Sequence, residues 1–200
     1  MTVTHEIPSY DPPKKLALVL SCVDFRLLDD IVNYLHIDNM TNRYYHFALA
    51  GASMGLTDAW KCQHVQPTNY KKPASQRCQF TQEELETLFS PWRQTFVHQF
   101  QAAMLLTDGK ISDVYIIQHQ HCGAYQVYLD RGAENWPLLY EQQVHKQHAE
   151  KLRDEIKSTF DTLAKSPLGT EKLQLKAPEI HNLFMDLRGH VVNLDTVPSK

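Results

Sequence analysis

The chain has 200 residues, a length that favours one domain large enough to bury a substantial core. Hydrophobic residues make up 42% and charged residues 22%, with a formal net charge of −3, so nothing in the composition favours nucleic acid or an anionic membrane as a partner. No apolar stretch approaches the ~20 residues that span a bilayer, and the N-terminus lacks the basic-then-apolar pattern of a signal peptide, which together predict a cytoplasmic protein.

The first quarter of the chain predicts a strand, a helix and a second strand. Residues 1–13 are polar and rich in proline, which predicts an extended N-terminal arm. Short apolar runs at 16–22 and 44–50 predict buried strands, and apolar residues at helical spacing across 27–35 predict a helix between them. Gly51 permits a turn after the second strand. This order, with short loops, favours a parallel sheet covered by helices.

The middle of the chain predicts a polar insertion followed by two helices. Residues 61–80 contain almost no aliphatic side chain and predict a surface insertion. Thr81 is a candidate N-cap, and Glu84, three residues later, would complete a capping box. The helix that starts there is expected to end at Pro91, and a second helix is expected over 92–106, because phenylalanines recur along one face.

The last half of the chain completes an α/β pattern. A strand is predicted at 113–118, a long amphipathic helix at 138–165 and a closing strand at 189–194, with a break at 166–169. The predicted fold is therefore α/β, a mainly parallel four- or five-stranded sheet flanked by helices. The whole chain, 1–200, is expected to form a single zinc-binding domain.

Two of the predicted strands end in residues that bind metals. Cys22 follows the first strand, and His119 and Cys122 follow the strand at 113–118. The carboxyl ends of parallel strands are where open α/β sheets bind ligands. Zinc accepts thiolate sulfur and imidazole nitrogen, and catalytic zinc typically has three protein ligands and one water. These residues therefore predict a zinc site, the alternative being a buried cysteine beside a hydrogen-bonded histidine.

Neighbours of these donors could take part in chemistry. Asp24 and Arg26 alternate with Cys22 in an extended segment, so all three side chains could point the same way. An arginine beside an aspartate favours the ionised carboxylate, although the pair could also be purely structural. His121 could replace His119 as a ligand, relay a proton, or simply pack or face solvent.

The remaining cysteines and histidines are expected to be ordinary. Cys62, His64 and Cys78 could form a second site, but their spacing fits no standard zinc module, so the two cysteines are predicted to be plain thiols. His145 and His148 lie on the polar helix and are predicted to be surface residues.

Both metal motifs resemble those of the beta-class carbonic anhydrase family. That family carries Cys-x-Asp-x-Arg after its first strand and His-x-x-Cys, usually followed by glycine, after a later strand. The matching residues here are Cys22, Asp24, Arg26, His119, Cys122 and Gly123, with weaker likeness at Ala50-Gly51 and Gly189–Leu194.

The resemblance implies reversible hydration of carbon dioxide to bicarbonate by a zinc-bound hydroxide. It also implies that Cys22, His119 and Cys122 bind Zn2+, that Asp24 orients the hydroxide and that Arg26 holds Asp24 away from the metal. In some family members the aspartate instead becomes a fourth ligand and closes the site. Family members are built from dimers, which implies a homodimer or a dimer of dimers.

Three departures from the family pattern bear on the substrate. Phe25 replaces a small residue, Ala48 and Leu49 stand where many relatives carry Arg-Asn, and Gln118 replaces a glycine. The first two predict a bulkier or more apolar pocket, which would also suit COS or CS2, and the missing arginine at 48 predicts no bicarbonate regulation. The sequence is also compatible with a catalytically silent zinc protein, and with a thiol redox sensor that uses the two motif cysteines.

Overall fold

The computed structural model describes most of the chain, namely residues 15–62, 80–167, 169 and 175–199. The expected N-terminal arm at 1–13 lies outside the described residues. So does the predicted insertion at 61–80, except for its two ends. Within the described part of the chain, no helix combines the length and the apolar character that crossing a membrane requires.

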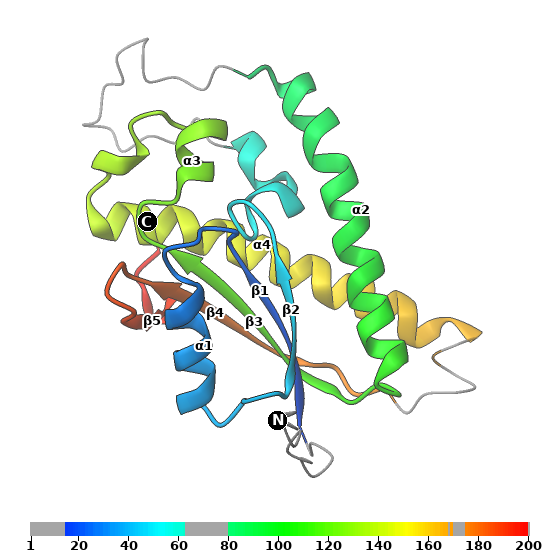
Figure 1. The fold of residues 1–200 in the computed structure, drawn as a ribbon. Coiled ribbons are helices and arrows are strands. Elements are labelled where there is room, and N and C mark those ends of the chain that lie inside the picture. The colour runs from blue at the N-terminus through cyan, green and yellow to red at the C-terminus, as the bar shows by residue number, and fades with distance from the viewer. Residues whose placement is uncertain (1–14, 63–79, 168, 170–174, 200) are drawn as a thin grey trace, which may run out of the picture.

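A five-stranded sheet in the order β2-β1-β3-β4-β5 forms the centre of the molecule (Figure 1). The first four strands in this order are parallel, and the short last strand is antiparallel to its neighbour. The prediction of an α/β fold with a mainly parallel sheet is confirmed. The strands are β1 (Leu16–Ser21), β2 (Tyr44–Ala48), β3 (Ile111–His119), β4 (Glu179–Met185) and β5 (Val191–Asn193).

The pairing of β1 with β3 determines which residues meet at the carboxyl edge of the sheet. Ser21, the last residue of β1, is paired with Ile117 of β3. Because the strands are parallel, the chain leaves β1 at Cys22 level with the end of β3, where His119 is the last strand residue. Two segments almost a hundred residues apart in sequence therefore end side by side.

One face of the sheet is covered by α1 (Leu28–Ile37). Its buried residues Ile31 and Leu35 pack against side chains of the sheet such as Val19, Tyr115 and Ile117. The predicted helix at 27–35 is confirmed.

The opposite face is covered by α2 (Gln82–Leu106) and α4 (Leu138–Lys165). Phe96 and Phe100 of α2 and Leu152 of α4 share a core with β1 and β3 residues such as Leu20. The predicted helix over 138–165 is confirmed.

The prediction of two helices separated at Pro91 is wrong. The helix that begins after the N-cap Thr81, with the predicted capping box to Glu84, continues through Pro91 to Leu106. Proline costs a helix one hydrogen bond, but Phe89 and Phe96 on either side of it are both buried. Burial of this continuous aromatic face outweighs the local preference of proline to end a helix.

Two elements were not predicted from the sequence. No strand was expected at β4, and no helix at α3 (Gly123–Tyr128), which begins directly after Cys122. The predicted closing strand at 189–194 contains β5. The other elements of the described residues are the 3-10 helices η1 (Met54–Leu56), η2 (Asp58–Cys62), η4 (Ala133–Asn135) and η5 (Leu194–Thr196).

Candidate metal centre

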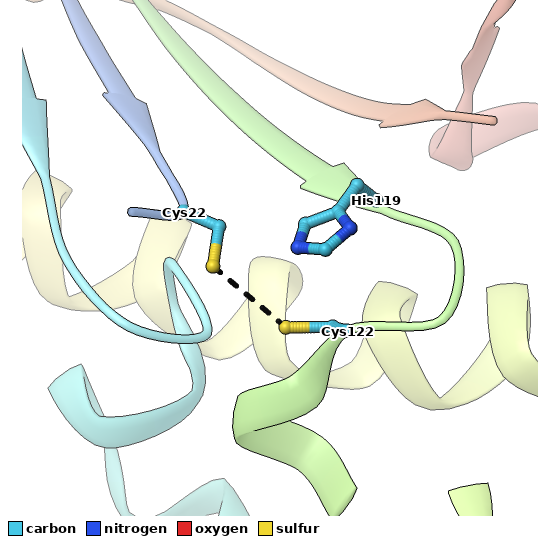
Figure 2. A group of neighbouring side chains, drawn as sticks. All are labelled: Cys22, His119 and Cys122. Carbon is cyan, nitrogen blue, oxygen red and sulfur yellow. Dashed lines mark hydrogen bonds between the residues drawn. The ribbon is translucent and has the colours of Figure 1, made fainter. Parts of the chain in front are cut away.

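Three predicted metal donors converge at the carboxyl edge of the sheet. The donor atoms of Cys22, His119 and Cys122 all lie within 4.8 Å of one another (Figure 2). Cys22 comes from the loop after β1, His119 is the last residue of β3, and Cys122 is the residue before α3. The structure therefore contains a possible metal-binding group, made from the residues that the motifs predicted.

The distance between the two sulfurs suits a shared metal ion. The Sγ atoms of Cys22 and Cys122 lie 3.8 Å apart, and neither cysteine forms a disulfide. Two sulfurs bonded at about 2.3 Å to one tetrahedral zinc are separated by about 3.8 Å. A disulfide would require about 2.05 Å. The separation of the two sulfurs is thus compatible with a shared tetrahedral ion and is too long for a covalent bond.

The ring of His119 is oriented by its own loop. Its Nδ1 donates a hydrogen bond to the carbonyl oxygen of Gln120 at 2.9 Å, so the lone pair lies on Nε2. Nε2 is buried and makes no hydrogen bond within the described residues. Figure 2 shows the ring turned toward the two sulfurs. A buried nitrogen with an unused lone pair is what a metal ligand requires.

The two sulfurs lie within hydrogen-bonding distance, and each affects the pKa of the other. A hydrogen bond from the Cys122 thiol lowers the pKa of Cys22 to about 4, and the nearby His119 imidazole and the Gly51 N–H act in the same direction. The same hydrogen bond, together with burial, raises the pKa of Cys122. A second negative charge is costly in this buried site, and a divalent cation would replace the thiol proton and allow both sulfurs to ionise.

Gly51 supports the site through its backbone. Its N–H lies 3.3 Å from the Cys22 sulfur, and its φ of +73° is in the left-handed region that favours glycine. A β-carbon at this position would lie 3.1 Å from the β-carbons of Ala124 and Met54. The expected turn is confirmed, and the contact with the sulfur is an additional role that the sequence did not indicate.

Asp24 and Arg26 form an ion pair beside the three donors. Arg26 donates from Nε to Oδ1 of Asp24 at 2.9 Å and from Nη2 to Oδ2 at 2.6 Å. These hydrogen bonds lower the pKa of Asp24 to about 2. Oδ2 lies 3.9 Å from Nε2 of His119, so the ionised carboxylate faces the metal-binding group without belonging to it.

His121 is not one of the three grouped donors. Its φ is +53°, and its N–H donates to Oε1 of Glu141 at 2.6 Å. Glu141 lies in the first turn of α4 and is buried. Glu141 could not be identified from the sequence, because no local pattern links position 141 to position 121.

The prediction that His145 and His148 are surface residues is wrong. Both are buried, and the ring centroid of His145 lies 4.0 Å from that of Tyr125 of α3, with the two rings tilted at 42° to each other. Nδ1 of His145 also lies 3.1 Å from Oε1 of Gln118, whose amide donates to Ser53. The polar surface of α4 is covered here because the unpredicted helix α3 packs on it.

The bulky Phe25 does not act on the site as the sequence had suggested. Its side chain is 90% exposed, so within this chain it does not narrow a pocket. The possible second site at Cys62, His64 and Cys78 rests on side chains outside the described residues.

A second cluster of donor-type side chains lies at the opposite edge of the sheet. It consists of Asp113, Glu179 and His181. Oδ1 of Asp113 already pairs with Nζ of Lys15 at 2.8 Å and with Nε2 of His181 at 2.9 Å. Asp113 in this cluster is therefore already engaged in ion pairs with Lys15 and His181.

No protein-family model matches the chain, and no curated protein sequence matches it.

Proposed function

We propose that this protein is a zinc enzyme similar to the beta-class carbonic anhydrases and catalyses the reversible hydration of carbon dioxide to bicarbonate. The observation that carries the proposal is the meeting of Cys22, His119 and Cys122 within 4.8 Å, next to the carboxylate of Asp24. Three protein ligands with room for water are typical of catalytic zinc. The mainly parallel sheet, with these donors at its carboxyl edge, adds support.

The residues of the site suit this chemistry. Zinc, when bound, would lower the pKa of a water ligand to about 7 and so supply a hydroxide nucleophile at neutral pH. Asp24, with a pKa of about 2, is ionised there and would accept a hydrogen bond from the nucleophile, which orients it toward carbon dioxide. Arg26 would keep Asp24 in that position.

A catalytically silent zinc protein would require Asp24 to become a fourth ligand. The hydrogen bonds from Arg26 oppose that movement, because both oxygens of the carboxylate would have to leave the guanidinium. The ion pair therefore supports a site with a coordination position left for water.

The test is stopped-flow hydration of carbon dioxide by protein of known zinc content, followed by assays of COS and CS2 hydrolysis on the same sample. We expect hydration that scales with bound zinc and stops when zinc is removed. Background hydration with rapid release of sulfide would instead identify a COS or CS2 hydrolase. Background rates with all three substrates would support the silent zinc protein.

A thiol redox function is tested by thiol titration with and without a chelator. If zinc occupies the site, Cys22 and Cys122 react slowly until the chelator removes the metal. A redox pair would react at the same rate in both conditions and would form a disulfide under mild oxidation.

We also propose that the chain forms a homodimer, as the resemblance implies. Four apolar side chains between residues 23 and 32 are at least 47% exposed. They are Val23, Phe25, Leu28 and Val32. Such an exposed apolar surface supports an interface with a second copy of the chain. Sedimentation velocity over a concentration series would measure the assembly, and a monomer at all concentrations would contradict it.

A further inference from the structure

The turn between the ligands His119 and Cys122 contains one residue in an unfavourable backbone conformation. His121 has a φ of +53°, which residues other than glycine rarely adopt. Because a positive φ is costly for a histidine, other contacts must stabilise this conformation. The conformation of this turn sets the position of Cys122 relative to His119. The contacts of the His121 backbone identify what holds it.

Two ionisable side chains from different parts of the fold form hydrogen bonds with the backbone of His121. Its N–H donates to Oε1 of Glu141 at 2.6 Å, and its carbonyl oxygen accepts from Nη2 of Arg26 at 3.1 Å. Arg26 belongs to the loop after β1, whereas Glu141 belongs to α4 behind the sheet. The backbone of His121 is therefore held by hydrogen bonds from two parts of the fold, the loop after β1 and the helix α4.

The carboxyl group of Glu141 is buried, which is uncommon for an acidic side chain. Glu141 is 2% exposed, and burial raises its pKa to about 7, while the hydrogen bond from His121 acts in the opposite direction. Its second oxygen, Oε2, makes no hydrogen bond within the described residues. Burying a carboxyl group whose second oxygen makes no hydrogen bond is costly. The hydrogen bond from the His121 N–H is the contact of Glu141 that offsets this cost, and it links Glu141 to the turn between His119 and Cys122.

We propose that Glu141 is a positioning residue of the metal centre. By accepting the N–H of His121 it fixes the turn that brings His119 and Cys122 to one ion, and it thereby determines the affinity and the coordination geometry of the bound metal. The inference rests on the proposed metal site, but it does not require that the metal hydrate carbon dioxide.

The test compares three variants of the full chain. Glu141→Gln keeps an oxygen that can accept the His121 N–H, Glu141→Leu removes the acceptor at similar size, and Glu155→Leu alters an exposed glutamate of the same helix. Zinc affinity is measured by competition with a chelator. The absorption spectrum of the Co2+-substituted protein reports the geometry of the thiolate ligands, and circular dichroism verifies that each variant folds.

We expect Glu141→Leu to bind zinc about 10–100-fold more weakly and to change the Co2+ spectrum, as loss of a group that orients a metal ligand typically does. Glu141→Gln is expected to restore the affinity and the spectrum of the parent, and Glu155→Leu to change neither. The His121 amide proton, followed by hydrogen exchange in the metal-free protein, should exchange faster only in Glu141→Leu.

Parent-like affinity and spectrum in Glu141→Leu would overturn the proposal. A Gln variant as weak as the Leu variant would also overturn it, because the acceptor would then not be what matters. If the parent binds Co2+ through its thiolates but hydrates no carbon dioxide, the proposed function fails while the role of Glu141 is still decided by these measurements. A parent that binds no metal would overturn both.

Discussion

Arg26 and Asp24 are joined by two side-chain hydrogen bonds, from Nε to Oδ1 at 2.9 Å and from Nη2 to Oδ2 at 2.6 Å. The backbone N–H of Arg26 adds a third bond to Oδ1 at 3.1 Å. The carboxylate therefore has a fixed direction and, with a pKa of about 2, a fixed charge at neutral pH. Because Oδ2 lies 3.9 Å from Nε2 of His119, this fixed charge faces the metal-binding group.

The first prediction concerns Asp24→Asn. The amide keeps the shape of the side chain but loses the charge, so in the proposed mechanism it would no longer orient the nucleophile as the carboxylate would. We expect kcat/KM for hydration of carbon dioxide to fall about 10–100-fold, with zinc content unchanged. Asp29→Asn, which alters an exposed aspartate in the first turn of α1, is the matched control and should retain full activity. Unchanged activity in Asp24→Asn would remove Asp24 from the mechanism, and lost zinc would make it a ligand.

The second prediction concerns the sulfur ligands. Replacement of Cys122 by serine removes a soft donor from a group of three protein donors, so we expect bound zinc, measured by elemental analysis, to fall from about one ion per chain to a small fraction. Cys62→Ser makes the same chemical change at a cysteine that the sequence predicts to be a plain thiol, and it should leave the zinc content unchanged. Equal zinc in the two variants would contradict the ligand assignment.

The third prediction compares two neighbouring apolar residues. Phe25 is 90% exposed, whereas Leu27 is 2% exposed and packs with Ile31 under α1. We expect Phe25→Ala to change the free energy of unfolding of the monomer by less than about 0.5 kcal/mol, and Leu27→Ala to lower it by about 2–5 kcal/mol. Urea titration at low protein concentration measures both values. A large loss in Phe25→Ala would mean that the side chain is buried in the folded monomer.

The grouping of Cys22, His119 and Cys122 could be predicted from the sequence because the signals were local. The two apolar runs identified the strands, the strand ends carried the donors, and parallel pairing of β1 and β3 brought those ends together. The same local reasoning failed at β4, where the polar residues His181 and Asn182 interrupt the apolar pattern of a strand. It also failed at Pro91, where long-range packing of a helix face outweighed a local signal.

The surroundings of the metal donors could not be predicted in this way. His121 meets Glu141, and Gln118 meets His145, only after α4 crosses the sheet next to β3. In sequence Glu141 and His145 belong to an amphipathic, charged segment whose polar side chains ordinarily face solvent. Packing of α3, β3 and β4 against this part of α4 buries them, and neither α3 nor β4 was predicted.

The last prediction follows from the burial of two histidines in α4. Burial lowers the pKa of His148 to about 3, and it lowers that of His145 well below the ordinary value of 6.5. Between these values and 6.5 the unfolded chain binds protons that the folded chain does not. The free energy of unfolding therefore decreases as pH falls below about 6.5, by up to about 1.4 kcal/mol per pH unit for each histidine. Glu141, whose pKa is raised to about 7, has the opposite effect. Between pH 7 and its pKa in the unfolded chain, it makes the free energy of unfolding increase as pH falls.

We expect His148→Leu to make this pH dependence shallower by about 1.4 kcal/mol per pH unit between pH 6 and pH 4, as measured by urea unfolding at each pH with equal metal content. Comparison with the parent cancels the contribution of Glu141, because Glu141 is present in both proteins. Leu152→Ala, which creates a cavity in the same helix without removing a titrating group, is the control and should lower stability equally at every pH. If the curves of His148→Leu and the parent run parallel, His148 is protonated in the folded protein as well as in the unfolded chain. A histidine that binds a proton in both states adds no pH dependence to the free energy of unfolding in this range.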